Sequence, residues 1–285
     1  MFNNRLPLLL AVLCTISVTL ISCDSRRETT ISYGKSDVII SNSLEIGGFI
    51  FDTGATHSVI FGDNEGMDGR EFVSDNKISD ANNRGRILKL YRVKSMSAGS
   101  LTIDNGEFLN IDKENLPEML HAYRGIIGMN IIDKANWFID IKRGEVTVLN
   151  KDSVMETKAD ALILEYNNEN SLPETRIKLG NQVLRKIIID TGSHAVLELL
   201  SSDIRELDKF YESSVIDTVR LSGLYNGITE HPVHNYKNVP LNHNHLMESL
   251  EAYDVKRERR IGFGFFKEFD YILIDTYRRK IYLYN

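Results

Sequence analysis

Two short stretches of the chain carry the same residues, Asp-Thr-Gly, at the end of an apolar run. The first is Phe49-Ile50-Phe51-Asp52-Thr53-Gly54-Ala55, and the second, in the other half of the chain, is Ile187-Ile188-Ile189-Asp190-Thr191-Gly192-Ser193. Carboxyl side chains serve proteins as general acids and bases, so these aspartates are candidates for chemistry. A lone Asp-Thr-Gly is weak evidence, because about one chain in twenty of this length contains one by chance. Two copies in the same context predict a duplicated fold that places Asp52 and Asp190 face to face.

The segments around both aspartates are typical of β-strands. Apolar residues on consecutive positions before each aspartate predict strands buried on both faces. Turn residues such as Gly47-Gly48, residues 82–85 and Gly180-Asn181 separate further strand patterns. Short helical patterns occupy residues 126–132 and 198–211. The sequence therefore predicts an all-β protein, with strands at residues 38–40, 44–51, 58–61, 87–93, 101–103, 138–141, 146–148, 162–164, 177–179, 183–190, 215–221, 233–239, 271–275 and 281–284.

The order of landmarks also repeats. Gly128, in Ile126-Ile127-Gly128, follows Asp52 at nearly the same distance along the chain as Gly262, in Arg260-Ile261-Gly262, follows Asp190. A repeat this long indicates two lobes of similar fold and not a solenoid. We therefore expect an N-terminal lobe over residues 31–150, a linker over residues 151–160 and a C-terminal lobe over residues 161–285. Asp140 and Asp275 end strand patterns at matching places in the two halves, and aspartates in such places are typical of turns.

Length and charge restrict the class of protein. The chain has 285 residues, enough for two packed lobes. Its 34 basic and 40 acidic residues give a net charge of −6, without a long run of either sign. This balance excludes the electrostatic signature of a nucleic-acid-binding protein.

The N-terminus has the features of an export signal. Arg5 precedes a mostly apolar segment, residues 6–21, which is short for a membrane span. The residues Leu20-Ile21-Ser22-Cys23 resemble a bacterial lipobox, so residues 1–22 are expected to be a lipoprotein signal peptide and Cys23 the lipidated N-terminus. An ordinary signal or an anchor helix is the alternative, and both also place the protein outside the cytoplasm. Residues 23–30 are expected to form a flexible tether. Cys14 is the only other cysteine, so the mature chain can form no disulfide.

The paired Asp-Thr-Gly turns, each followed by an apolar-apolar-Gly element, resemble the aspartic proteases, in particular their retropepsin-like group. Ile126-Ile127-Gly128 is similar to the group's second signature, with Ile261-Gly262 as its less regular counterpart. The resemblance covers nearly all of the mature chain and implies two pseudo-symmetric lobes, fused in one chain, with a cleft between them. It implies an aspartic-type endopeptidase, a hydrolase in which a water held between Asp52 and Asp190 attacks the peptide bond. As in that family's dyad, one carboxyl would be protonated and the other charged.

The resemblance also implies roles for the neighbouring residues. The hydroxyls of Thr53 and Thr191 would interlock the two turns, while Gly54 and Gly192 would let the backbone approach the carboxyls. The next position differs, because Ser193 can donate a hydrogen bond to Asp190, whereas Ala55 offers Asp52 none. We therefore expect Asp190 to be the more often ionised member of the pair.

Several segments depart from the family pattern. Arg260 places a charge where the pattern has an apolar residue. The alternative register Gly262-Phe263-Gly264 avoids the charge but matches the apolar-apolar-Gly pattern only in part. The flaps that close over substrate in this family are expected at residues 80–86 and 223–227. Tyr225 is more simply a surface residue than a flap aromatic.

The remaining polar and aromatic candidates are interpreted structurally. Four histidines, His231, His234, His243 and His245, fall close together but lack metal-site spacing, so we expect no metal. His57 and His194 follow the two turns, where a structural or solvent-facing role is favoured. Trp137 and the tyrosines near the C-terminus are expected in the core or on a strand face.

The sequence therefore predicts an exported, lipid-anchored aspartic endopeptidase of the cell envelope. We expect a peptide or protein substrate, a membrane contact through Cys23, no cofactor, no nucleic acid, and a monomer with an intramolecular dyad. A catalytically weak or inactive peptide-binding lipoprotein on the same fold is the alternative. A dimer that pairs aspartates between molecules is a third possibility, which the similar offsets disfavour.

Overall fold

The computed structural model describes residues 27–30, 44–46, 48–62, 69–79, 85–98, 101–149, 160–222, 228–242 and 245–285. The described chain forms one sheet of 13 strands and one of seven, joined by short helices, which confirms the all-β class. None of the helices described is long and apolar enough to cross a membrane. The signal peptide, Cys23, the strand expected at residues 38–40 and linker residues 151–159 lie outside the described residues.

The seven-stranded sheet belongs to the N-terminal half, with strand order β2-β3-β8-β4-β7-β6-β5. Helix α1 (Met129–Ile132) follows its central strand β8, and the short 3₁₀ turns η2 (Lys113–Asn115) and η3 (Glu118–Leu120) precede it. The strands are β2 (Leu44–Ile46), β3 (Phe49–Phe51), β4 (Ser58–Phe61), β5 (Glu71–Ser79), β6 (Gly85–Ala98), β7 (Leu101–Ile111) and β8 (Gly125–Ile127).

The C-terminal half contributes the run β12-β13-β18-β14-β17-β16-β15 of the larger sheet. Helix α2 (Ser201–Leu207) follows β14, and helix α3 (Phe263–Phe266) follows β18. The strands are β12 (Glu174–Leu179), β13 (Gln182–Asp190), β14 (Leu197–Leu200), β15 (Ser213–Ser222), β16 (Ile228–Leu241), β17 (His245–Val255) and β18 (Arg259–Gly262).

The two halves repeat the same pattern of strand pairing. In the first, β8 pairs parallel to β3 and antiparallel to β4, and β4 pairs parallel to β7. In the second, β18 pairs parallel to β13 and antiparallel to β14, and β14 pairs parallel to β17. Because β3 and the end of β13 lie in the interior of their sheets, their consecutive apolar residues are buried on both faces. Asp52 follows β3 and Asp190 ends β13, so both aspartates lie at the ends of interior strands.

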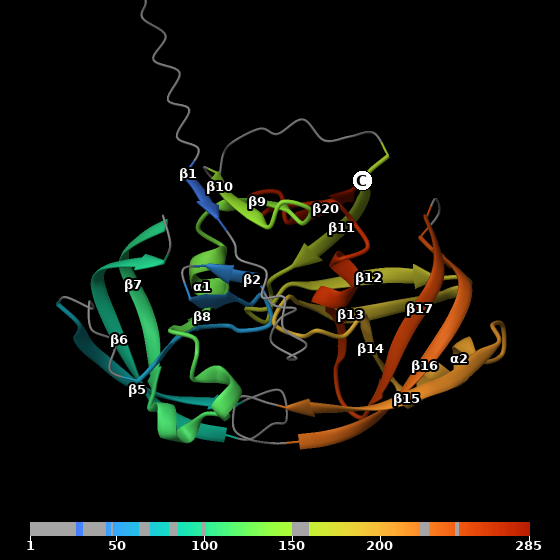
Figure 1. Ribbon diagram of the computed structural model, residues 1–285, viewed down its shortest axis with the longest axis horizontal. Coiled ribbons are helices and arrows are strands. Elements are labelled where there is room, and N and C mark those ends of the chain that lie inside the picture. The colour runs from blue at the N-terminus through green and yellow to red at the C-terminus, as the bar shows by residue number, and fades with distance from the viewer. Residues whose placement is uncertain are drawn as a thin grey trace, which may run out of the picture.

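Six strands along the upper side of Figure 1 join the two halves. The N-terminal half contributes three of these strands and the C-terminal half the other three. Strands β9 and β19 pair antiparallel where the halves meet, so the two expected lobes share one sheet. In order across the sheet, the strands are β1 (Arg27–Thr30), β10 (Glu145–Leu149), β9 (Asn136–Asp140), β19 (Tyr271–Asp275), β20 (Lys280–Tyr284) and β11 (Leu162–Asn167).

Trp137 links this joining sheet to the first aspartate turn. Its ring is 1% exposed and meets the ring of Phe51 edge-on, with centroids 5.0 Å apart. The indole Nε1 donates to the carbonyl oxygen of Ile132 at 2.7 Å. The prediction that Trp137 lies in the core is confirmed. Because Phe51 precedes Asp52, this packing helps to fix where the carboxyl lies.

Three sequence predictions are corrected. The helical stretch expected over residues 126–132 is reduced to α1, because Gly125–Ile127 pairs with β3 as strand β8. Residues 27–30 form strand β1, paired with β10, and are not part of a flexible tether. The helix expected over residues 198–211 is reduced to α2, because Leu197–Leu200 pairs with β17 as strand β14.

The expected flap segments lie at the turns of two long hairpins. Strands β5 and β6 form one hairpin and strands β15 and β16 the other. Both run toward the middle of the lower edge in the view of Figure 1. Their turns, residues 80–84 and 223–227, lie outside the described residues, so no placement of Tyr225 follows.

Candidate active site

The two Asp-Thr-Gly turns meet and are locked together by reciprocal hydrogen bonds. The backbone N–H of Thr53 donates to Thr191 Oγ1, and the N–H of Thr191 donates to Thr53 Oγ1, each at 3.0 Å. The hydroxyls donate onward, from Thr53 to the carbonyl of Ile189 at 2.7 Å and from Thr191 to the carbonyl of Phe51 at 2.8 Å. Both threonines are buried. One chain thus supplies both turns of a closed, pseudo-symmetric arrangement.

The glycines of the two turns bring the carboxyls together. A Cβ atom on Gly54 would lie 2.4 Å from Asp190 Cγ, and one on Gly192 would lie 2.5 Å from Asp52 Cγ. Each glycine therefore packs directly against the aspartate of the other turn, with no room for a side chain. The Gly54 N–H donates to Asp52 Oδ1 at 2.7 Å, and the Gly192 N–H donates to Asp190 Oδ1 at 3.1 Å.

Asp52 is surrounded so that its protonated form is favoured. The pKa of Asp52 is raised to about 8, mainly by loss of solvation and to a lesser degree by the negative charge of Asp190. The Gly54 N–H and the charge of Arg260 act in the opposite direction but are outweighed. Asp52 therefore carries a proton at neutral pH, while remaining partly exposed to solvent.

Asp190 has a different environment, because backbone N–H groups and a cation contact its carboxyl directly. Its Oδ1 accepts the N–H groups of Gly192 and Ser193, both at 3.1 Å. Its Oδ2 accepts Arg260 Nη1 at 2.8 Å, in an ion pair that is almost entirely buried. Hydrogen bonds and an opposite charge both favour a carboxylate over a carboxylic acid. The two aspartates thus differ in their surroundings.

The expected hydrogen bond from the Ser193 hydroxyl to Asp190 is corrected by the structure. Ser193 Oγ donates instead to Glu198 Oε1 at 2.7 Å, and Ser193 reaches Asp190 only through its backbone N–H. Glu198 is buried on strand β14, and this burial raises its pKa. The Ser193 hydroxyl is thus engaged by Glu198, and the side chain that places an opposite charge at Asp190 is Arg260.

The apolar-apolar-Gly elements lie behind the turns, as strands β8 and β18. Ile126 and Ile127 pair with Ile50 and Phe51. In the second half, Ile261 pairs with Ile189 and Gly262 with Asp190. This register places Arg260 where the first half has Ile126, so Arg260-Ile261-Gly262 is the counterpart and the alternative Gly262-Phe263-Gly264 register is wrong.

Glycine is required in both elements because the backbone of the turn passes close behind. A Cβ atom on Gly128 would lie 2.6 Å from the carbonyl oxygen of His57, and one on Gly262 would lie 2.2 Å from that of Ala195. The residue after each glycine then donates its N–H into the turn, from Met129 to the carbonyl of Ala55 at 2.8 Å and from Phe263 to that of Ser193 at 2.6 Å.

Sequence reasoning missed the contacts of three side chains that bear on the site. Arg260 was visible as a charge out of pattern, but its partner Asp190 was not foreseen, and Glu198 gave no signal at all. Asn130 ends the stretch Ile126-Ile127-Gly128-Met129-Asn130 that resembles the second signature, but its partner Ser58 was not foreseen. Its Oδ1 accepts both the N–H and the hydroxyl of Ser58, at 2.7 and 2.8 Å, and Ser58 Oγ accepts the Gly128 N–H at 2.9 Å. The C-terminal half has Gly264 in the place of Asn130.

The histidines have structural partners. His231 contacts the carbonyl of Asp254 through Nδ1 at 2.8 Å and the Thr229 hydroxyl through Nε2 at 2.7 Å. His245 packs on Phe269 and His194 on Tyr253. Within the described ranges, no group of three or more His, Cys, Asp or Glu side chains could hold a metal ion. His243 lies outside those ranges.

Asp140 and Asp275 take part in turns, as their sequence position indicates. Asp140 Oδ1 accepts the backbone N–H of Arg143 at 2.9 Å, and Asp275 Oδ1 accepts that of Arg278 at 2.8 Å. The matching hydrogen bonds close equivalent turns in the two halves.

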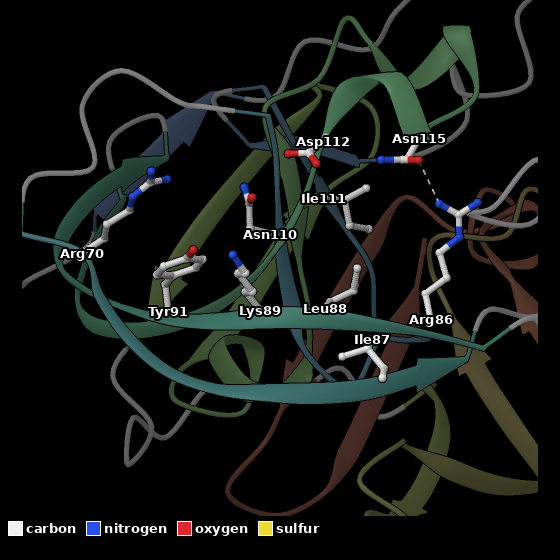
Figure 2. A pocket seen from close by; sticks show the side chains of 10 residues that line it. All are labelled: Arg70, Arg86, Ile87, Leu88, Lys89, Tyr91, Asn110, Ile111, Asp112 and Asn115. Carbon is white, nitrogen blue, oxygen red and sulfur yellow. Dashed lines mark hydrogen bonds between the residues drawn. The ribbon is translucent and has the colours of Figure 1, made fainter.

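A hollow of about 380 Å³ lies over β6 and β7 (Figure 2). Its lining includes Arg70, Lys89 and Tyr91, together with Asn110 and Asp112. No residue of either Asp-Thr-Gly turn lines it.

Neither a scan against models of protein families nor a search of curated proteins found a match to this chain.

Proposed function

We propose that the protein is an aspartic-type endopeptidase in which Asp52 and Asp190 form an intramolecular dyad. The observation that carries the proposal is the four-bond interlock of Thr53 and Thr191, with each turn's glycine against the opposite carboxyl. This arrangement holds together two carboxyls that repel each other when both are charged, and this repulsion destabilises the fold. A purely structural pair of turns does not require such a destabilising contact.

The two environments fit the two roles that peptide hydrolysis needs. Asp190 would take a proton from the attacking water, because its surroundings favour the charged form. Asp52 would donate its proton to the carbonyl oxygen of the peptide as the tetrahedral intermediate forms. The proton gained by Asp190 would then pass to the leaving nitrogen as the C–N bond breaks. A hydroxyl of the intermediate would return its proton to Asp52 as the new carboxyl group forms, which restores the singly protonated dyad.

The repeated strand pairing and the two long hairpins support the finer fold proposal. We infer two retropepsin-like lobes with a substrate cleft between them, closed by the β5–β6 and β15–β16 hairpins. The exposed apolar side chains of Phe72, Ile87 and Val215 lie on these hairpins and would suit an unfolded peptide.

The proposed location follows from the N-terminal sequence alone. A lipid on Cys23 would tether the enzyme to a membrane of the cell envelope, facing a protein or peptide substrate. A peptide-binding lipoprotein that does not cleave is the second candidate. It is favoured by the ion pair of Arg260 with Asp190, because a carboxylate held by a cation is a weaker base.

The test is an assay of the purified chain on a denatured protein between pH 4 and 8. We expect cleavage that is lost in Asp52→Asn and in Asp190→Asn and kept in Asp160→Asn, a matched change at an exposed aspartate outside the site. Binding of peptides without cleavage would support the second candidate. Cleavage that survives either substitution in the dyad would refute the endopeptidase proposal.

A further inference from the structure

The second half of the protein carries a charged pair where the first half carries an apolar pair. In the first half, Ile126 of β8 lies between Ile50 of β3 and Val59 of β4. At the same place in the second half, Arg260 lies between Ile188 of β13 and Glu198 of β14. The fold therefore needs only apolar residues here, and the charged pair calls for another explanation.

Arg260 is held among carboxylates from three elements. Its Nη1 contacts Asp190 Oδ2 at 2.8 Å, its Nη2 contacts Glu258 Oε2 at 3.0 Å, and its Nε lies 4.0 Å from Glu198 Oε2. The guanidinium side chain is only 14% exposed. Burying a cation is costly unless close carboxylates compensate, so this geometry holds the charge of Arg260 at Asp190.

We propose that Arg260 is a positioning residue that decides where the single proton of the dyad resides. Its guanidinium contacts Asp190 Oδ2 and places a positive charge beside that carboxyl, which leaves the proton of the dyad on Asp52. The inference rests on the proposed function, in which only the singly protonated dyad can work. Arg260 itself neither gains nor loses a proton.

The sign of the effect follows from the charges that face the site. Asp52, at the end of β3, lies against Asp190. The carboxyls of Glu198 on β14 and Glu258 before β18 act on Arg260. The charge of His231 on β16 acts on Glu198. Removing the cation leaves Asp190 among these carboxyls without its opposite charge. Asp190 would then be protonated at higher pH, which would move the acid limb of the rate profile upward. The basic limb, set by Asp52, would move upward by less, because Arg260 is the weakest of the influences on Asp52.

The first experiment compares kcat/KM against pH for the wild type, Arg260→Gln and Arg260→Lys. We expect the acid limb of Arg260→Gln to rise by about one pH unit or more, since a nearby opposite charge shifts a carboxyl by about 1 to 3 units. Arg260→Lys should restore most of the shift because it keeps the charge. Ser193→Ala is the matched control, and its acid limb should move less. An acid limb that stays in place in Arg260→Gln would overturn the proposal, whatever happens to the overall rate.

The second experiment needs no activity. In Asp52→Asn the Asp190 carboxyl is alone, and ¹³C NMR of labelled aspartate can follow its titration in chains that keep Arg260 or also carry Arg260→Gln or Arg260→Lys. We expect its midpoint to lie about one pH unit or more lower with arginine than with glutamine, with lysine close to arginine. If Arg260→Gln does not fold, Arg260→Met supplies the form without the charge, and its midpoint is compared with that of the arginine and lysine forms. Equal midpoints would refute the role of Arg260 even if the enzyme is active, whereas shifted midpoints without cleavage would refute only the proposed function.

Discussion

Replacing Asp52 by asparagine should stabilise the fold at neutral pH, although it removes a residue of the proposed dyad. Asp52 has a pKa of about 8 in the folded chain and an ordinary value of 3.8 when exposed. Between these values the folded state keeps a proton that the unfolded state has lost. The free energy of unfolding therefore falls as pH rises from about 4 to about 8. Asparagine resembles the protonated acid in shape and does not titrate, so it removes this pH dependence of the free energy of unfolding.

The size of the effect can be worked from the same values. At pH 7 the ordinary pKa of 3.8 lies 3.2 units below the solution pH, and each unit is worth about 1.36 kcal/mol. The upper limit is thus about 4 kcal/mol. Because Asp52 is partly open to solvent, which screens its repulsion by Asp190, we expect about 2 kcal/mol at pH 7 and almost none at pH 4.

The assay is urea denaturation of the wild type, Asp52→Asn and Asp190→Asn from pH 4 to 8. Asp190→Asn should instead destabilise the fold, by about 3 kcal/mol, because it removes the closest partner of the buried Arg260. If Asp52→Asn raises and Asp190→Asn lowers the free energy of unfolding, the two aspartates have different environments in the folded chain. If Asp52→Asn were destabilising at pH 7, or if its effect did not grow with pH, the assignment of the proton to Asp52 would be refuted.

Two further predictions concern the turns that hold the pair. Thr53→Ala removes a hydroxyl that makes two buried hydrogen bonds, so it should lower the free energy of unfolding by about 2 to 4 kcal/mol. Thr53→Ser keeps the hydroxyl and should lower it by about 1 kcal/mol. Equal losses for the two variants in urea denaturation would show that the interlocking hydrogen bonds do not stabilise the fold. Gly54→Ala and Gly192→Ala should abolish the proposed cleavage and lower the urea midpoint, because a Cβ atom would lie within 2.5 Å of the opposite carboxyl. Gly85→Ala, whose Cβ would meet nothing closer than 3.6 Å, is the matched control, and similar losses in all three would contradict the packing argument.

Local sequence was sufficient for the parts of the fold that depend on local pattern. The apolar runs before Asp52 and Asp190 are interior strands because such residues need burial on both faces, and the spacing of the glycine elements indicated that the two halves repeat one order of landmarks. Asp140 and Asp275 were predictable as turn residues for the same reason. Each of these features depends on residues that are close in the sequence or repeated in it.

Pairing between distant segments was not predictable. Residues 27–30 have no apolar pattern, and they form a strand only because β10 offers an edge. Leu200, Ile204 and Leu207 have helical spacing, but pairing with β17 draws the first of them into a strand. Arg260 and Glu198 are far apart in the sequence, and only the β14–β18 pairing brings them together. The charged environment of Asp190 therefore required the structure.

The central claim is that one chain holds a complete dyad. Its most direct test is isothermal titration of the monomer with a peptide isostere whose hydroxyl mimics the tetrahedral intermediate, since an enzyme binds such a mimic far more tightly than its substrate. The account predicts one isostere bound per chain near pH 6, with binding weakened at least tenfold in both Asp52→Asn and Asp190→Asn. A stoichiometry of one isostere per two chains, or binding that is indifferent to either substitution, would contradict it.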